Sequence, residues 1–250
     1  MTVRRESCGN IPIKHFVSDD ARGAVLALHG FGGSKESCAI QALAERLCPA
    51  GIDVAAIDWE AHGERGRDFS QLSVDGCVAD LRTAEQYAAE NISENIGVFA
   101  TSFGGFIALL RMEQGEAPYK RVVLRVPAVD MADSLVNAAR LSDTDISVEK
   151  ARAQGYFPMR MAERFSVPFS FYEELAAVSC VRKCAAWRGD IVSVIYAEND
   201  ELVRRRNTEE FALLNNIPAR MISGTGHRMA QPEKLSEALN AAAEKLTEIL

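Results

Sequence analysis

Short runs of apolar, β-branched residues alternate with longer segments of helical periodicity along most of the chain. Each run is almost entirely apolar, which is typical of strands buried on both faces of a parallel sheet. The runs predict six strands, at residues 24–28, 53–58, 95–100, 122–126, 191–197 and 219–222. The segments between and after them predict helices at residues 37–50, 74–91, 104–114, 207–215 and 232–250. This alternation predicts an α/β fold with a mostly parallel central sheet and helices on both faces.

The alternation changes at the N-terminus and once in the second half of the chain. Residues 2–7 and 11–17 are typical of an edge hairpin, and a long stretch separates the strands at 122–126 and 191–197. We expect a single domain of residues 1–250, in which residues 130–181 form a small, mostly helical cap. Its apolar side chains either build a small core of their own or line a substrate pocket. The candidates for the pocket are Met131, Phe157, Phe165, Phe169 and Phe171.

Composition and charge narrow the function classes. The chain has 48% hydrophobic and 25% charged residues, which is typical of a globular protein. Its net charge of −7 disfavours nucleic acid and anionic membranes as partners, but leaves a buried ligand site open. No apolar run approaches the ~20 residues of a membrane helix, and no signal peptide is evident. We therefore expect a soluble, cytoplasmic protein without stable membrane association.

The six cysteines show no spacing that predicts a disulfide framework. Cys180 and Cys184 could share one helix face, but a zinc site needs three or four ligands and no histidine is close to them. We expect buried thiols, no metal site and a reducing compartment.

Ser102 lies in a turn of small residues between a predicted strand and a predicted helix. A sharp strand-to-helix turn of this kind raises the hydroxyl above the sheet edge. Ala100 and Gly104 leave room for the strand and the helix to approach each other. The pattern predicts a nucleophile, although a serine at such a junction can also be purely structural.

A serine nucleophile needs a base and an acid that orients the base. His227, in the glycine-rich loop after the last predicted strand, is the candidate base. Asp200 follows the preceding strand and is the candidate acid, with Glu198 and Glu201 as rivals. The order serine, acid, histidine favours a catalytic triad over three unrelated loop residues.

The oxyanion of a tetrahedral intermediate needs two hydrogen-bond donors. The N–H group of Phe103 is the first candidate and that of Phe31, in a glycine-rich loop after the first parallel strand, is the second. This loop lacks the lysine and the serine or threonine of a phosphate-binding P-loop, which argues against a nucleotide site.

The segments HGFGG, ATSFGG, YAENDELV and SGTGH together resemble the α/β-hydrolase superfamily over nearly the whole chain from about residue 24. Within it, the size and the insertion are most similar to small bacterial carboxylesterases, of the feruloyl or cinnamoyl esterase and monoacylglycerol lipase branches. Ala100 replaces a more usual glycine, and Arg204 stands where proline is common. The run of arginines at 204–206 is either a solvated helix start or a binding site for an anionic substrate group.

The resemblance implies a serine hydrolase that cleaves a small or medium ester with an apolar or aromatic acyl group through an acyl-enzyme, without a cofactor. The expected partner is this small-molecule ester, and the oligomeric state stays open. One alternative is a serine aminopeptidase, in which Glu163, Glu173 or Glu174 would anchor the substrate's amino group. Another is a catalytically silent relative that only binds a ligand.

Overall fold

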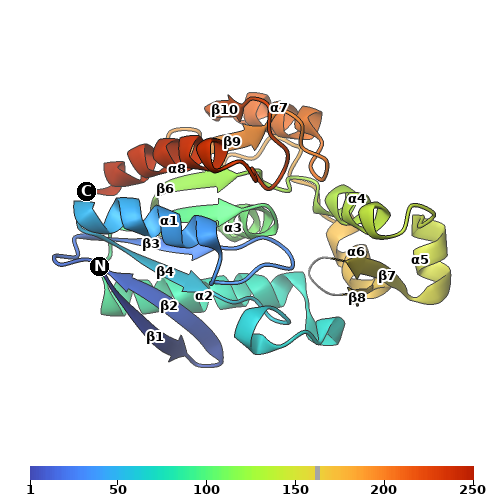
Figure 1. Ribbon diagram of the computed structural model, residues 1–250, viewed down its shortest axis with the longest axis horizontal. Coiled ribbons are helices and arrows are strands. Elements are labelled where there is room, and N and C mark those ends of the chain that lie inside the picture. The colour runs from blue at the N-terminus through green and yellow to red at the C-terminus, as the bar shows by residue number, and fades with distance from the viewer. Residues whose placement is uncertain (161–163) are drawn as a thin grey trace.

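The computed structural model describes residues 1–160 and 164–250, and its centre is an eight-stranded sheet in the order β1-β2-β4-β3-β5-β6-β9-β10 (Figure 1). The first two strands form the antiparallel edge hairpin, and β2 pairs antiparallel with β4. All later pairings in this sheet are parallel. The strands are β1 (Thr2–Cys8), β2 (Ile11–Val17), β3 (Gly23–Leu28), β4 (Ile52–Ile57), β5 (Ile96–Thr101), β6 (Tyr119–Arg125), β9 (Val192–Ala197) and β10 (Ala219–Ile222).

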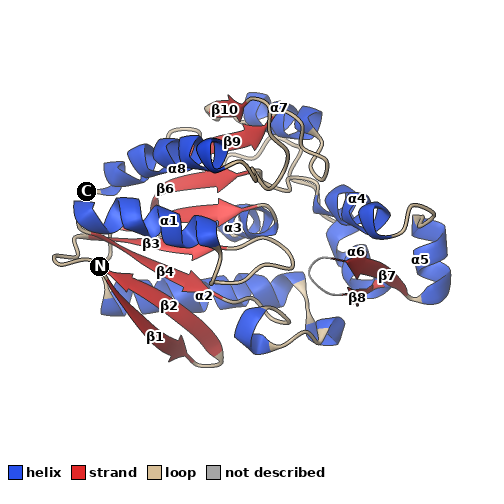
Figure 2. Ribbon diagram, viewed as in Figure 1, coloured by secondary structure: helices blue, strands red, loops and turns tan. Residues whose placement is uncertain are grey.

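Helices cover both faces of the sheet, as the apolar strands require (Figure 2). One face packs against α1 (Cys38–Leu47) and α8 (Pro232–Leu246) in one apolar cluster. The other face packs against α2 (Val74–Asn91), α3 (Phe103–Glu113) and α7 (Arg205–Leu214) in a second cluster. The predicted mostly parallel α/β fold is confirmed.

The insertion between β6 and β9 lies beyond the carboxyl ends of the parallel strands (Figure 1). It contains α4 (Met131–Ser142), α5 (Val148–Gln154) and α6 (Phe169–Ala176), together with a hairpin of β7 (Tyr156–Arg160) and β8 (Arg164–Pro168). The sequence predicted helices here but not the hairpin. Two paired strands have little stability alone, so the hairpin depends on its packing against α4 and α6. We call this insertion the cap.

No helix in the described ranges is long and apolar enough to cross a membrane. All six cysteines are free thiols. Cys180 is buried as expected, whereas Cys184 is only partly buried.

Candidate active site

Ser102 occupies the sharp turn between β5 and α3, with φ 52° and ψ −113°. A positive φ in a residue other than glycine stores about 1–3 kcal/mol of strain, which the surrounding packing must maintain. The turn is tight enough that a Cβ on Gly104 would come within 2.8 Å of the carbonyl oxygens of Leu28 and His29. Glycine at this position therefore lets α3 start directly against the end of β3.

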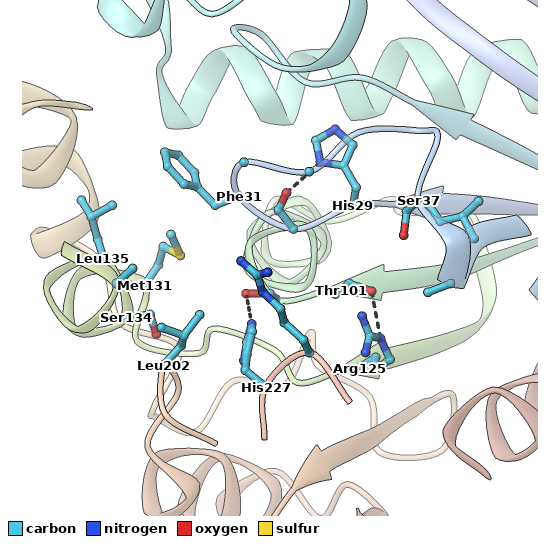
Figure 3. A pocket seen from close by; sticks show the side chains of 18 of the residues that line it. His29, Phe31, Ser37, Thr101, Arg125, Met131, Ser134, Leu135, Leu202 and His227 are labelled. Carbon is cyan, nitrogen blue, oxygen red and sulfur yellow. Dashed lines mark hydrogen bonds between the residues drawn. The ribbon is translucent and has the colours of Figure 1, made fainter. Parts of the chain in front are cut away.

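His227 reaches Ser102 from the loop that follows β10. Its Nε2 lies 3.1 Å from Ser102 Oγ, and its Nδ1 lies 2.9 Å and 3.0 Å from the two carboxylate oxygens of Asp200 (Figure 3). The imidazole is buried, with 7% of His227 exposed. The structure thus brings the three predicted residues into one hydrogen-bonded chain that can move a proton from the hydroxyl to the imidazole.

The structure also shows which of the three candidate acids, Asp200, Glu198 or Glu201, contacts the imidazole of His227. Asp200 Oδ1 accepts hydrogen bonds from the N–H groups of Leu202 and Val203, which fix the carboxylate toward His227. Glu201 accepts the backbone N–H of His227, and Glu198 accepts the backbone N–H of Gly224. Both glutamates therefore hold the histidine loop in place, and only Asp200 contacts the imidazole ring.

The N–H groups of Phe31 and Phe103 have no hydrogen-bond partner among the described residues. Phe103 is the first residue of α3, where the N–H groups are free and the helix dipole favours a negative charge. The loop that carries Phe31 lies against the nucleophile, because a Cβ on Gly30 would be 3.2 Å from Ser102 Cβ. Both donors are thus unpaired among the described residues, one directly after Ser102 and one in the loop that lies against it.

A neutral histidine anchors this loop. Burial lowers the pKa of His29 to about 4. The Nδ1 of His29 bonds the carbonyl of Gly30, and its Nε2 accepts the N–H of Trp59. Trp59 in turn donates its indole N–H to the carbonyl of His29. These bonds fix the loop against the end of β4.

A buried ion pair fixes the far end of the same loop. Lys35 and Asp58 are 2% and 0% exposed, and their Nζ–Oδ2 distance is 2.8 Å. Lys35→Met should lower the free energy of unfolding by about 3–5 kcal/mol, because it leaves the Asp58 charge buried without its cation. Urea unfolding measures the loss. Arg5→Met removes an exposed pair with Glu36 and should leave the urea midpoint nearly unchanged; equal losses would contradict the distinction.

The buried His62 should make the free energy of unfolding depend on pH. Burial lowers the pKa of His62 from 6.5 to about 3, and its Nε2 has no partner among the described residues. Below about pH 6.5 the unfolded chain binds a proton that the folded chain excludes, so stability falls as the pH decreases toward 3. His62→Asn should reduce this slope by up to about 1.4 kcal/mol per pH unit. Urea unfolding between pH 7 and about 4 tests it, and an unchanged slope would contradict it.

A cavity of about 420 Å³ opens beside Ser102 and His227. Met131 lines it as predicted. Its cap side is apolar and is completed by residues that the sequence analysis did not single out, namely Leu135, Ala138, Met159 and Leu202. Phe31 lies on the same side (Figure 3). The site therefore has room for an apolar group next to the hydroxyl.

Phe157, Phe165, Phe169 and Phe171 do not line this cavity, which corrects their predicted position. Phe157 stacks on Phe169, 6.0 Å between ring centroids, and Phe165 stacks on Phe69 at 4.7 Å. Phe171 stacks on Phe31 at 6.2 Å, so it supports the pocket wall from behind. These rings pack against other aromatic rings, because aromatic pairs are favourable in a small core.

The described residues contain no cluster of three or more histidine, cysteine or acidic side chains that could hold a metal ion. The site offers the Ser102 hydroxyl, the His227 imidazole, the Asp200 carboxylate and two backbone N–H groups.

Residues 19–156 match the model of the family described as "Serine aminopeptidase, S33", which is more than half of the chain. The chain belongs to this family. The match includes Ser102, Phe31 and Phe103 but ends before Asp200 and His227. No match was found among the curated proteins.

Solved structures of other hydrolases share the fold of this S33 family member. They include the alpha/beta hydrolase domain-containing protein 10 from mouse (TM-score 0.74, 13% identity, 100% of both chains). Est1E from Butyrivibrio proteoclasticus, in a structure with bound ferulic acid, has a TM-score of 0.71 at 16% identity over 98% of this chain and 96% of that chain. The monoacylglycerol lipase of Paleococcus ferrophilus has a TM-score of 0.67 at 18% identity, over 100% of both chains. The resemblance to α/β hydrolases is confirmed, and the chain is a hydrolase of this fold.

One residue of this hydrolase's pocket escaped the sequence analysis as a functional candidate. Arg125 ends the buried strand β6 and lines the cavity with only 7% of its surface exposed. The available signal was a charged residue inside the otherwise apolar predicted strand at 122–126, because arginine is almost never fully buried without a partner.

Proposed function

We propose that this protein hydrolyses carboxylic esters through an acyl-enzyme formed on Ser102. The observation that carries the proposal is the hydrogen-bonded chain from Ser102 through His227 to Asp200, which faces a cavity of about 420 Å³. Nucleophile, base and orienting acid within hydrogen-bond reach are the requirements for this chemistry.

In the proposed reaction, Ser102 Oγ attacks the ester carbonyl carbon while His227 Nε2 takes the hydroxyl proton. Asp200 keeps the other proton on Nδ1 and stabilises the imidazolium. The N–H groups of Phe31 and Phe103 receive the oxyanion. His227 then gives its proton to the leaving alkoxide, and a water molecule, activated by the same imidazole, releases the acid and restores the serine hydroxyl.

The walls of the cavity favour an apolar acyl group. Met131, Leu135 and Met159 lie on the cap side of Ser102, and burying one apolar side-chain equivalent contributes about 1.5–3 kcal/mol. That amount ranks acyl groups by size without selecting a single compound. The structural similarity to Est1E and to a monoacylglycerol lipase is compatible with esters of this kind.

The name of the family supports aminopeptidase activity as a second candidate. Such an enzyme needs an acidic anchor for the substrate's amino group, yet no Asp or Glu of the described residues lines the cavity. Glu174 accepts the N–H of Val74 away from the cavity, Glu173 is exposed, and Glu163 lies outside the described residues. The positions of these carboxylates favour the ester. The third alternative is a silent binding protein, which a wide separation of Ser102 and His227 would favour. Ser102 Oγ and His227 Nε2 are instead 3.1 Å apart.

A fluorophosphonate probe followed by a substrate panel tests the proposal. We expect the probe to label Ser102, as read by mass spectrometry of the labelled peptide. We also expect 4-nitrophenyl acyl esters to be cleaved faster than aminoacyl 4-nitroanilides. Faster arylamide cleavage would reverse the order of the two candidates, and absence of both labelling and turnover would contradict hydrolysis by Ser102.

A further inference from the structure

The cavity extends past Ser102 to a side away from the cap, which the proposed ester cleavage does not use. We call this side the arginine lobe. Its walls are the first turn of α1 (Ser37–Ile40), Thr101, Arg125 and Leu235. Figure 3 shows Ser37, Thr101 and Arg125 together on this side, across His227 from Met131 and Leu135. Any group held in this lobe lies close to the nucleophile, because Thr101 directly precedes Ser102.

Arg125 is a buried cation without an anionic partner. No carboxylate of the described residues lies within ion-pair distance of it; Asp200 pairs with His227 instead and attracts the guanidinium only from farther away. Its Nε donates to Thr101 Oγ1 at a long 3.4 Å, and its Nη1 has no hydrogen-bond partner in the described part of the chain. Burial lowers the pKa of Arg125 to about 10, so the guanidinium remains charged at neutral pH. A buried charge in this state is costly, and a bound anion would offset the cost.

The N-terminus of α1 adds a second source of positive potential to the same lobe. The helix has ten residues, and its first turn contains no acidic side chain. The N–H groups of Cys38 and Ala39 have no partner among the described residues, and the Ser37 side chain does not cap them. Glu36, just before the helix, is bound to Arg5 and Lys14 instead. Free N–H groups and the helix dipole together favour an anion.

The backbone directly after Arg125 is strained. Val126 has φ 45°, which is a clear outlier for a β-branched residue. The carbonyl of Arg125 accepts the N–H of Ser102 at 3.0 Å. Two strained residues, Ser102 and Val126, thus lie on neighbouring strand ends, and strain of this kind persists where the surrounding structure enforces it at functional positions.

We propose that the arginine lobe binds a carboxylate of the ester substrate, with the Arg125 guanidinium as its main partner. The planar guanidinium matches a carboxylate in two parallel hydrogen bonds. The inference rests on the proposed function, since it specifies the ester that Ser102 cleaves. The net charge of −7 provides no long-range attraction for an anion, so a preference for anionic esters has to come from local contacts.

Paired esters that differ only in one charge test the proposal. One pair is mono-4-nitrophenyl adipate and its methyl ester, with the charge on the acyl side. The other is 3-carboxyphenyl butyrate and its methyl ester, with the charge on the leaving group. In Arg125→Met, the anionic-to-neutral ratio of kcat/KM should fall about 10- to 100-fold for at least one pair, the range expected for hydrogen bonds to a charged group. Ratios that stay within about twofold for both pairs would overturn the proposal.

Two further variants provide the controls. Arg205→Met removes the same charge outside the cavity, where Arg205 pairs with Glu209, and should leave both ratios within about twofold. A fall equal to that of Arg125→Met would mean a general charge effect and overturn the proposal. Arg125→Lys keeps a charge but loses the planar fork, so the ratio should fall several-fold. If Arg125→Met does not fold, Arg125→Lys is the deciding variant. An unchanged anionic-to-neutral ratio in Arg125→Lys would then overturn the proposal.

A binding measurement separates this inference from the proposed reaction. Adipate should raise the thermal unfolding midpoint of the unsubstituted protein, and inorganic phosphate tests whether any anion suffices. One outcome is that adipate stabilises the unsubstituted protein but not the Arg125→Met variant, and that no ester is cleaved. This would support the anion site and contradict the proposed ester hydrolysis. If esters are cleaved but neither the ratio nor the midpoint depends on Arg125, the hydrolase stands and the anion site is contradicted. Stabilisation by phosphate alone would contradict the carboxylate assignment.

Discussion

Replacing Ser102 by alanine should lower ester turnover by about 10⁴- to 10⁶-fold while leaving the fold intact. The loss is large because serine and histidine act as one unit, and the imidazole has no other hydroxyl within hydrogen-bond distance among the described residues. Steady-state kinetics on a 4-nitrophenyl ester measures it, and circular dichroism with urea unfolding checks the fold.

The control for this variant is Ser170→Ala, which changes an exposed serine of α6 and should keep full activity. Ser102→Gly offers a second comparison. It should be as inactive as Ser102→Ala but more stable by about 1 kcal/mol, because glycine accepts φ 52° without strain. Full activity in Ser102→Ala would exclude Ser102 as the nucleophile.

Asp200→Asn should lower kcat by about 10³- to 10⁴-fold, with a smaller change in KM. The amide cannot stabilise the imidazolium, and its NH₂ group facing Nδ1 would favour the wrong tautomer of His227. The same assay measures this loss, with a panel of pH values to separate a shifted profile from a lower plateau.

Glu198→Gln is the matched control, because it makes the same chemical change in the same loop. Glu198 accepts the N–H of Gly224 and does not touch the imidazole, so its variant should lose less than about tenfold in kcat. Equal losses in the two variants would mean that loop structure, and not the acid of a triad, accounts for the effect.

The core elements were predictable because their local signals agree with their burial. The helix at Val74–Asn91 and the strand at Ala219–Ile222 have the predicted bounds, and Ser73 caps the helix by accepting the N–H of Gly76. The cap hairpin was not predictable in this way. Pro158 and Pro168 lie inside or at the end of its strands, which weakens a strand signal that only packing on α4 and α6 restores.

The site was predictable where chain order determines position, and unpredictable where packing does. Loops that follow parallel strands meet at one sheet edge, so Ser102, Asp200 and His227 could be expected together, while their catalytic roles stay predictions. Which aromatic rings of the cap face the cavity depends on three-dimensional packing, and Phe157 and Phe169 turn toward each other instead. Arg125 was predicted only as a strand residue. That its guanidinium lacks an anionic partner can be seen only in the three-dimensional structure.

The way the cap is anchored bears on how a substrate enters. Phe157, Phe171 and Leu175 of the cap are buried in the same continuous apolar cluster as the sheet and α3. Lifting the cap as a rigid lid would expose this shared cluster to water, at about 25 cal/mol for each Å² of apolar surface. The cap therefore has no low-energy open state that binding to a lipid–water interface could favour. Catalysis should follow the concentration of dissolved monomeric ester, without the interfacial activation that a hinged lid confers.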